Sequence, residues 1–322
     1  MDSAVGRGMS ILYWAETIEN RKGSTLQDET YLHLIYDLFA QPYRSPAMQN
    51  TKLKPSGFPT RKLPTFFLRQ ELARLGAVAS KLRGKVIATL SFPVRVTERG
   101  TQPIYGNTHD VIAGIVGCRR PALLVCAGFS VLTRKNLNPV IQATKRAGTV
   151  VVVETFDPPT SFLISNGVGT LMGIQYFSQG GNATRGNLAQ LEAHIDSRSF
   201  TFLGRKSLLL ICGEISVVCS NRTTGRVSFR PDVSDNLKRR MLGSGVIINP
   251  THTLMRRHEI REWRNYLSRD GRVYVSASNW ESSKNRSTWR TLHSLWHDGN
   301  PQDYCRPAVE NEWLCYREWP LP

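Results

Sequence analysis

From residue 84 onward, the chain alternates short apolar runs with longer segments that have helical periodicity. The apolar runs have the length of strands and fall at 85–92, 122–126, 149–153, 207–211, 245–252 and 272–278. Helical patterns occupy 136–147, a stretch around 188–194 and an arginine-rich stretch at 254–268. Strands that alternate with helices are typical of α/β proteins. The pattern therefore predicts an α/β domain over 84–322.

The segment before residue 84 has a different pattern and predicts an appendage to this domain. Apolar residues recur at helical spacing over 32–39 and again over 65–82. Five prolines interrupt 41–64, so that stretch cannot be helical throughout. We predict a mainly helical N-terminal extension at 1–83. At the other end, 281–322 is a tryptophan-rich extension of the main domain, with a final strand at 312–316.

Polar side chains close several of the apolar runs. They are Glu154, Cys212, Asn249, His252 and Asn279. Because strand ends in α/β folds converge on one crevice, we expect these side chains to lie near one another. Gly213 follows the cysteine and permits a turn that faces the thiol toward a pocket, as a nucleophile requires. The alternative is a buried thiol that only packs, as free cysteines usually do.

The composition adds a strong positive charge. Lys and Arg number 42 against 25 Asp and Glu, a formal charge of +17 that attracts phosphate backbones, acidic membranes or anionic substrates. The basic residues are scattered in short groups, which favours solvated surface, with a basic face for nucleic acid as the alternative. The chain has no run of eighteen apolar residues, and its N-terminus lacks the apolar region of a secretory signal. We predict a cytoplasmic protein that does not enter a membrane.

The cysteines and histidines do not form a metal-binding pattern. Six cysteines are spaced irregularly, which favours reduced thiols over a disulfide framework. His293 and His297 are four residues apart and would share one face of a helix, but no Cys-x-x-Cys pair accompanies them. The sequence also lacks a Walker or dinucleotide loop. We predict no metal and no cofactor.

Three blocks in order resemble the carbon-nitrogen hydrolase, or nitrilase, superfamily. They are FLGRKSLLLICGEIS at 202–216, GVIINPTHT at 245–253 and RVYVSASNW at 272–280, and the resemblance runs from about Gly84 to Trp280. It implies a four-layer α-β-β-α sandwich and a Glu-Lys-Cys set that attacks amides or nitriles through a thioester. Members of the family often associate through a helical surface, so the resemblance also implies a homo-oligomer.

The resemblance places Cys212 at the nucleophile and Glu214 at an acidic position two residues later. Ala127 stands where the family has its glutamate, and no lysine occurs in the segment that should carry one, 175–185. Arg185 could supply the positive charge there. Glu192 resembles the additional glutamate that orients the active site in many family members.

Two residues could replace the missing base. Glu154 ends the strand next in sequence, and adjacent strand ends can be about 5 Å apart, so this carboxylate could reach Cys212. The alternative is a solvated loop carboxylate or an ion pair with a nearby arginine. His252 should face the same crevice and could serve as the base for Cys212, or it could bond backbone carbonyls instead.

The sequence thus predicts a nitrilase-like carbon-nitrogen hydrolase or acyl transferase for a small amide or nitrile. The alternative is an inactive protein of the same fold that serves as a binding module, with or without a basic surface for nucleic acid.

Overall fold

The computed structural model describes residues 61–77, 84–97, 100–178, 182–221, 223–253, 259–282 and 292–322. The chain divides into two compact units, 1–58 and 59–322, and every described residue belongs to the second. The helical pattern predicted at 32–39 lies outside the described residues. Helix α3 (Thr65–Ala77), which the sequence assigned to the N-terminal extension, is part of the second unit.

The first large sheet has eight strands, in the order β18-β19-β1-β4-β6-β7-β8 with β5 paired to β6. Their bounds are β1 (Val86–Ser91), β4 (Leu123–Cys126), β5 (Val131–Thr133), β6 (Val150–Asp157), β7 (Pro159–Ser165), β8 (Val168–Gly173), β18 (Cys305–Glu310) and β19 (Cys315–Pro320). Strands β1, β4 and β6 are parallel, and antiparallel strands flank them on both sides. The strand predicted at 312–316 is shifted along the chain, because β19 begins only at Cys315.

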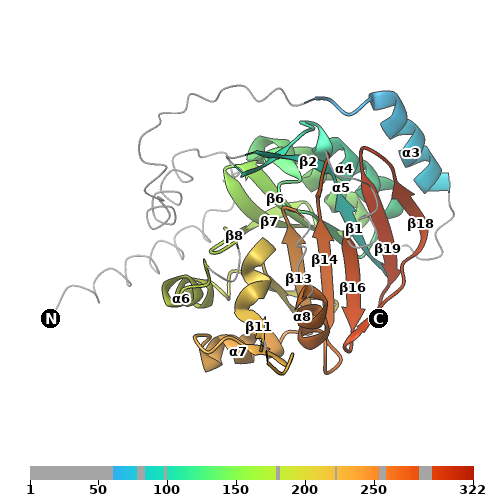
Figure 1. Ribbon diagram of the computed structural model, residues 1–322. Helices are drawn as coiled ribbons and strands as arrows, with labels where there is room; N and C mark the ends of the chain where they lie inside the picture. Colours follow the sequence, from blue (N-terminus) through green and yellow to red (C-terminus); the bar gives the residue numbers. More distant parts are fainter. Residues whose placement is uncertain are drawn as a thin grey trace, which may run out of the picture. The chain divides into compact units, whose positions relative to one another are not determined.

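The second large sheet has the order β17-β16-β14-β13-β10-β9. Its strands are β9 (Ser199–Phe202), β10 (Arg205–Leu209), β13 (Val246–Thr251), β14 (Val273–Ser278), β16 (His293–His297) and β17 (Asn300–Pro301). Strands β10, β13 and β14 are parallel, and Figure 1 shows β13, β14 and β16 side by side. The expectation that His293 and His297 share a helical face is wrong, because both lie in strand β16.

Two small sheets complete the strands. One pairs β15 (Trp280–Glu281), β2 (Pro93–Thr97) and β3 (Gly100–Pro103), and the other pairs β11 (Val218–Ser220) with β12 (Val227–Phe229).

Alternating side chains on the central strands belong to different cores. On β10, Leu208 packs in a cluster with helical residues, whereas Leu209 packs in a cluster that contains residues of both large sheets. Ile247 and Ile248 divide in the same way on β13. This alternation follows from the two-residue period of a strand. Full burial of one such side chain is worth roughly 1.5–3 kcal/mol, so both faces of the sheet contribute to stability.

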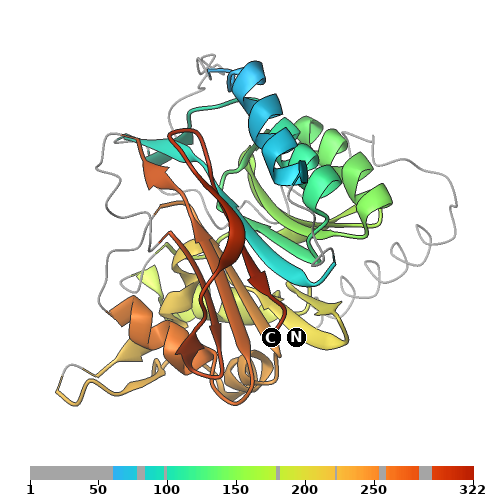
Figure 2. The same cartoon turned by 90° about the vertical axis from the view of Figure 1, so that its right-hand side faces the viewer.

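On each large sheet, helices cover the face opposite to the cluster that the two sheets share. Helices α4 (Thr108–Arg119) and α5 (Asn138–Ala147) lie beside α3 on the first sheet, as Figure 2 shows in blue and green. Helices α6 (Arg185–Ala193), α7 (Asp235–Leu242) and α8 (Glu259–Leu267) supply apolar side chains to the cluster on the second sheet. The prediction of an α/β fold is confirmed. Within the described ranges, every helix is too short or too polar to cross a bilayer.

Candidate active site

Cys212 lies at a tight turn between strand β10 and the 3-10 helix η5 (Cys212–Val217). Its backbone is left-handed, with φ of 48°. The sequence assigned the turn to the freedom of Gly213, but the cysteine itself takes the conformation that L residues disfavour. A non-glycine residue persists in this region only when its surroundings hold it there.

Asn249 holds this turn from the neighbouring strand. Its side-chain amide donates to the carbonyl oxygens of Leu210 and Cys212 at 2.9 and 3.0 Å. The Tyr274 hydroxyl donates in turn to Asn249 Oδ1 at 2.8 Å. Because Asn249 and Tyr274 lie in β13 and β14, the second sheet fixes the backbone of Cys212 directly.

Glu214 holds the same turn from the other side. Its carboxylate accepts from the backbone amides of Tyr176 and Ile211 at 2.7 and 2.8 Å, and it pairs with the guanidinium of Arg198. Both charged side chains are completely buried. A buried carboxylate is tolerated because an opposite charge and two amides satisfy it. Arg198 was not predicted as this partner, because no motif in the sequence marks it.

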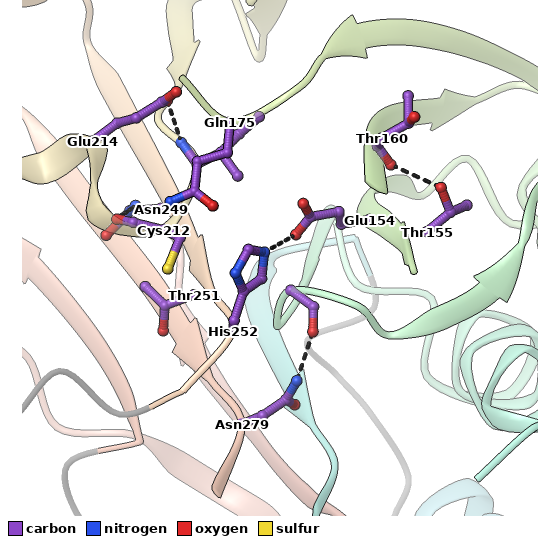
Figure 3. Close-up of polar contacts among 12 residues, drawn as sticks. Glu154, Thr155, Thr160, Gln175, Cys212, Glu214, Asn249, Thr251, His252 and Asn279 are labelled. Atoms are coloured by element: carbon purple, nitrogen blue, oxygen red, sulfur yellow. Dashed lines mark hydrogen bonds and ion pairs between the residues drawn. The ribbon is translucent and has the colours of Figure 1, made fainter. Parts of the chain in front are cut away.

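His252 lies immediately after β13 and connects Glu154 to Cys212. Its Nε2 lies 2.8 Å from Glu154 Oε2, and Figure 3 shows the imidazole between this carboxylate and the Cys212 sulfur. The Cys212 sulfur faces the other side of the same ring, so the imidazole lies between the two groups. With Nε2–H donating to the carboxylate, Nδ1 is left to accept the thiol proton.

The charges around His252 affect its pKa more than its burial does. Burial alone lowers the pKa of His252, but the Glu154 carboxylate and the neighbouring Cys212 raise that pKa well above its ordinary value. Glu154 is only 1% exposed, and it lies inside β6 rather than at the end of the strand. It is therefore a buried ion-pair partner of His252 and not a solvated carboxylate.

Gly128 and Phe129 form the wall behind His252, just after β4. A Cβ added to Gly128 would lie 2.2 Å from His252 Cδ2 and 2.8 Å from Glu154 Oε2, so only glycine fits there. The Phe129 ring stacks on the imidazole, with centroids 3.7 Å apart and planes 8° apart. Asn279 donates from its side-chain amide to the Gly128 carbonyl at 2.6 Å. Neither Gly128 nor Phe129 was predicted from the sequence, and the glycine directly after Ala127 was the available signal.

The structure places the other two candidates away from this cluster. The two carboxylate oxygens of Glu192 accept from Ser234 Oγ at 2.7 Å and from Asn236 Nδ2 at 2.8 Å, and these bonds lower the pKa of Glu192. Glu192 thus supports the start of α7. Arg185 is the first residue of α6, and its side chain is exposed. Among the described contacts, neither side chain meets Cys212, His252 or Glu154.

The described residues contain no group of three or more His, Cys, Asp or Glu side chains that could hold a metal ion. His293 instead bonds Thr89 Oγ1 at 2.7 Å and Ser91 Oγ at 2.5 Å. The described cysteines are all free thiols.

No protein-family model matches the sequence, and no curated protein matches it. Similar solved structures include an amidase from Nesterenkonia sp., 11% identical with a TM-score of 0.44, with 76% of this chain and 94% of the amidase covered. They also include a cysteine-to-alanine variant of Nesterenkonia AN1 amidase from the nitrilase superfamily, at 10% identity and a TM-score of 0.45, again covering 76% and 94%. A third is such a variant in complex with butyramide, at 10% identity, a TM-score of 0.44 and the same coverage. Any inference of function rests on Cys212, His252 and Glu154 themselves.

Proposed function

We propose that this protein is a cysteine-dependent hydrolase or acyl transferase that acts on the carbon-nitrogen bond of a small amide or nitrile. The observation that carries the proposal is the position of the His252 imidazole, which bonds Glu154 on one side and faces the Cys212 sulfur on the other. A nucleophile, a base within its reach and a third group that orients the base are the signature of covalent catalysis.

The architecture supports a nitrilase-like fold for this chemistry. Two sheets share one apolar cluster, and helices pack on the opposite face of each. This arrangement favours the four-layer α-β-β-α sandwich that the sequence blocks imply. The catalytic set departs from the family pattern, because a histidine stands between the carboxylate and the thiol.

The proposed reaction begins with transfer of the Cys212 proton to His252 Nδ1. The thiolate attacks the amide carbon and forms a C–S bond, and the electron pair of the C=O bond moves onto oxygen. When the C–N bond breaks, the nitrogen leaves with the proton from His252, and a thioester remains on Cys212. His252 then removes a proton from water, or from an acceptor amine, which attacks the thioester and releases Cys212.

The protein can supply positive charge and N–H donors at the reacting carbon without a lysine. Glu154 stabilises the imidazolium that forms during each proton transfer. The first amides of η5, those of Cys212 and Gly213, have no acceptor within the helix, since the earliest N–H groups of any helix lack one. They are therefore suited to bind the oxygen that gains charge.

Hydrolysis of a panel of short amides, followed by ammonia release, tests the proposal together with the reactivity of the thiol. We expect turnover in the wild type and its complete loss in Cys212→Ala, with Cys219→Ala, which removes a half-buried thiol elsewhere, as the matched control. Iodoacetamide should alkylate Cys212 faster than Cys118, Cys219 or Cys305, and His252→Ala should remove this advantage. Absence of turnover with a Cys212 no more reactive than Cys219 would favour the inactive binding protein.

A further inference from the structure

We propose that Phe129 is a positioning residue that holds the His252 imidazole in the orientation needed for proton exchange with Cys212. This inference rests on the proposed cysteine chemistry. Phe129 touches neither a substrate nor the reacting sulfur in this scheme, and it acts through the histidine.

The backbone at Gly128 and Phe129 is the reverse of what local preference favours. Phe129 has φ of 57°, in the left-handed region that glycine tolerates best, whereas the glycine one residue earlier has no positive φ. The glycine is explained by space, because its missing Cβ leaves room for His252 and Glu154. The phenylalanine is explained by its ring, which this backbone conformation lays flat on the imidazole.

The surroundings fix the Phe129 ring from behind. Phe156 packs its edge against the ring, with centroids 5.4 Å apart and planes at 84°. Phe156 and Glu154 are two residues apart on β6, so they lie on the same face of that strand. One strand therefore provides both the carboxylate for His252 and the support for Phe129. The Gly128 amide also donates to the Thr251 carbonyl at 3.0 Å, which ties this turn to the residue before His252.

The stacked ring supplies a constraint that the carboxylate does not. A single hydrogen bond at Nε2 does not by itself fix the torsion about the Cβ–Cγ bond, and rotation about that bond would move Nδ1 away from the sulfur. A parallel ring at 3.7 Å fixes the plane. An aromatic face also attracts a cation, so the contact favours the imidazolium over the neutral ring.

The test measures how the alkylation rate of Cys212 by iodoacetamide depends on pH, from about pH 5 to about pH 9, across the range where histidine titrates. Phe129→Leu removes the aromatic face and keeps an apolar side chain, while Phe129→Tyr keeps the face and serves as the control. We expect Phe129→Leu to slow alkylation about threefold or more near neutral pH and to move the rising limb to higher pH. Phe129→Tyr should follow the wild type. Cys219 in the same molecules reports general changes in thiol exposure.

A second variant protects the test against misfolding. Phe129→Gly also removes the ring, but glycine accepts the left-handed backbone, so it should shift the profile as the leucine variant does while relieving local strain. Profiles of both variants that coincide with the wild type would overturn the role of Phe129 and leave the proposed function intact. If wild-type Cys212 instead reacts like Cys219 and ignores His252→Ala, the proposed function fails first.

Discussion

His252 and His293 are both largely buried, but their neighbours differ in charge. His252 lies between the Glu154 carboxylate and the Cys212 thiol, and its side chain is 13% exposed. His293, 3% exposed, projects from β16 of the second sheet to Thr89 and Ser91 on β1 of the first. Charged partners raise the pKa of His252 well above its ordinary value. Burial, aided by the positive charge of Arg317, lowers the pKa of His293 well below it.

The comparison shows that the partners, more than the burial, decide what a buried histidine can do. Removal from water disfavours the imidazolium at both positions. A carboxylate at 2.8 Å compensates for this cost at His252, which can then gain and lose a proton. Hydroxyl groups can donate or accept, so they satisfy His293 as a neutral ring. His293 therefore links the two sheets, whereas His252 is suited to proton transfer.

The largest expected effect comes from breaking the charged environment of His252. Glu154→Gln keeps the size of the side chain, but its NH2 group can donate to Nε2 and force the proton onto Nδ1, the wrong tautomer for accepting the thiol proton. We expect kcat/KM on the amide substrate to fall by about 10²- to 10⁴-fold. His293→Gln, measured per folded molecule, is the matched control and should retain activity. Equal losses of kcat/KM in both variants would contradict the conclusion that only His252 takes part in proton transfer.

The positions of the central parallel strands follow from the sequence because each coincides with an apolar run. The run at 245–252 becomes β13, and the run at 272–278 becomes β14, each within one or two residues. Buried parallel strands are apolar on both faces, so their runs are easily recognised. The edge strand β18 and its neighbour β19 contain charged residues, and β19 also contains aromatic ones, which explains why the predicted final strand was displaced.

The contents of the candidate site were only partly predictable. The strand ends in the sequence indicated that Glu154 and His252 lie at one crevice with Cys212. The two residues were predicted as alternative bases, because a sequence does not specify which side chains touch. Glu192 and Arg185 follow from the resemblance, which places an orienting glutamate and a positive charge in this part of the chain. The resemblance does not determine which face of α6 each residue occupies, and Glu192 meets the start of α7 instead.

The next effect concerns stability and should appear at His293. His293→Ala would leave a cavity and remove the imidazole partner of Thr89 and Ser91, and we expect the free energy of unfolding to fall by about 2–4 kcal/mol. Urea unfolding at neutral pH measures it. His297→Ala is the control, because this histidine lies in the same strand and is only half-buried, and it should cost about 1 kcal/mol or less. A smaller loss for His293 than for His297 would refute the linking role.

The smallest effect is a pair of pH dependences with opposite signs. His293 has a lowered pKa in the folded state, so below about pH 6.5 the unfolded chain binds a proton that the native protein does not. Its contribution should therefore make stability fall as pH falls below about 6.5, with a slope of up to about 1.4 kcal/mol per pH unit. His252 has a raised pKa in the folded state. Its contribution is fully present below about pH 6.5 and is lost as pH rises toward the folded value.

Unfolding curves at several pH values for the wild type, His293→Gln and His252→Gln separate the two contributions. Relative to the wild type, His293→Gln should lose stability less steeply on the acidic side, because glutamine does not titrate. His252→Gln should decline less steeply above about pH 6.5, for the same reason. Carboxylates that contact neither histidine are common to all three proteins and cancel in the differences. If both variants changed the pH dependence of stability on the same side of about pH 6.5, the neighbours of the two histidines would not set their charge.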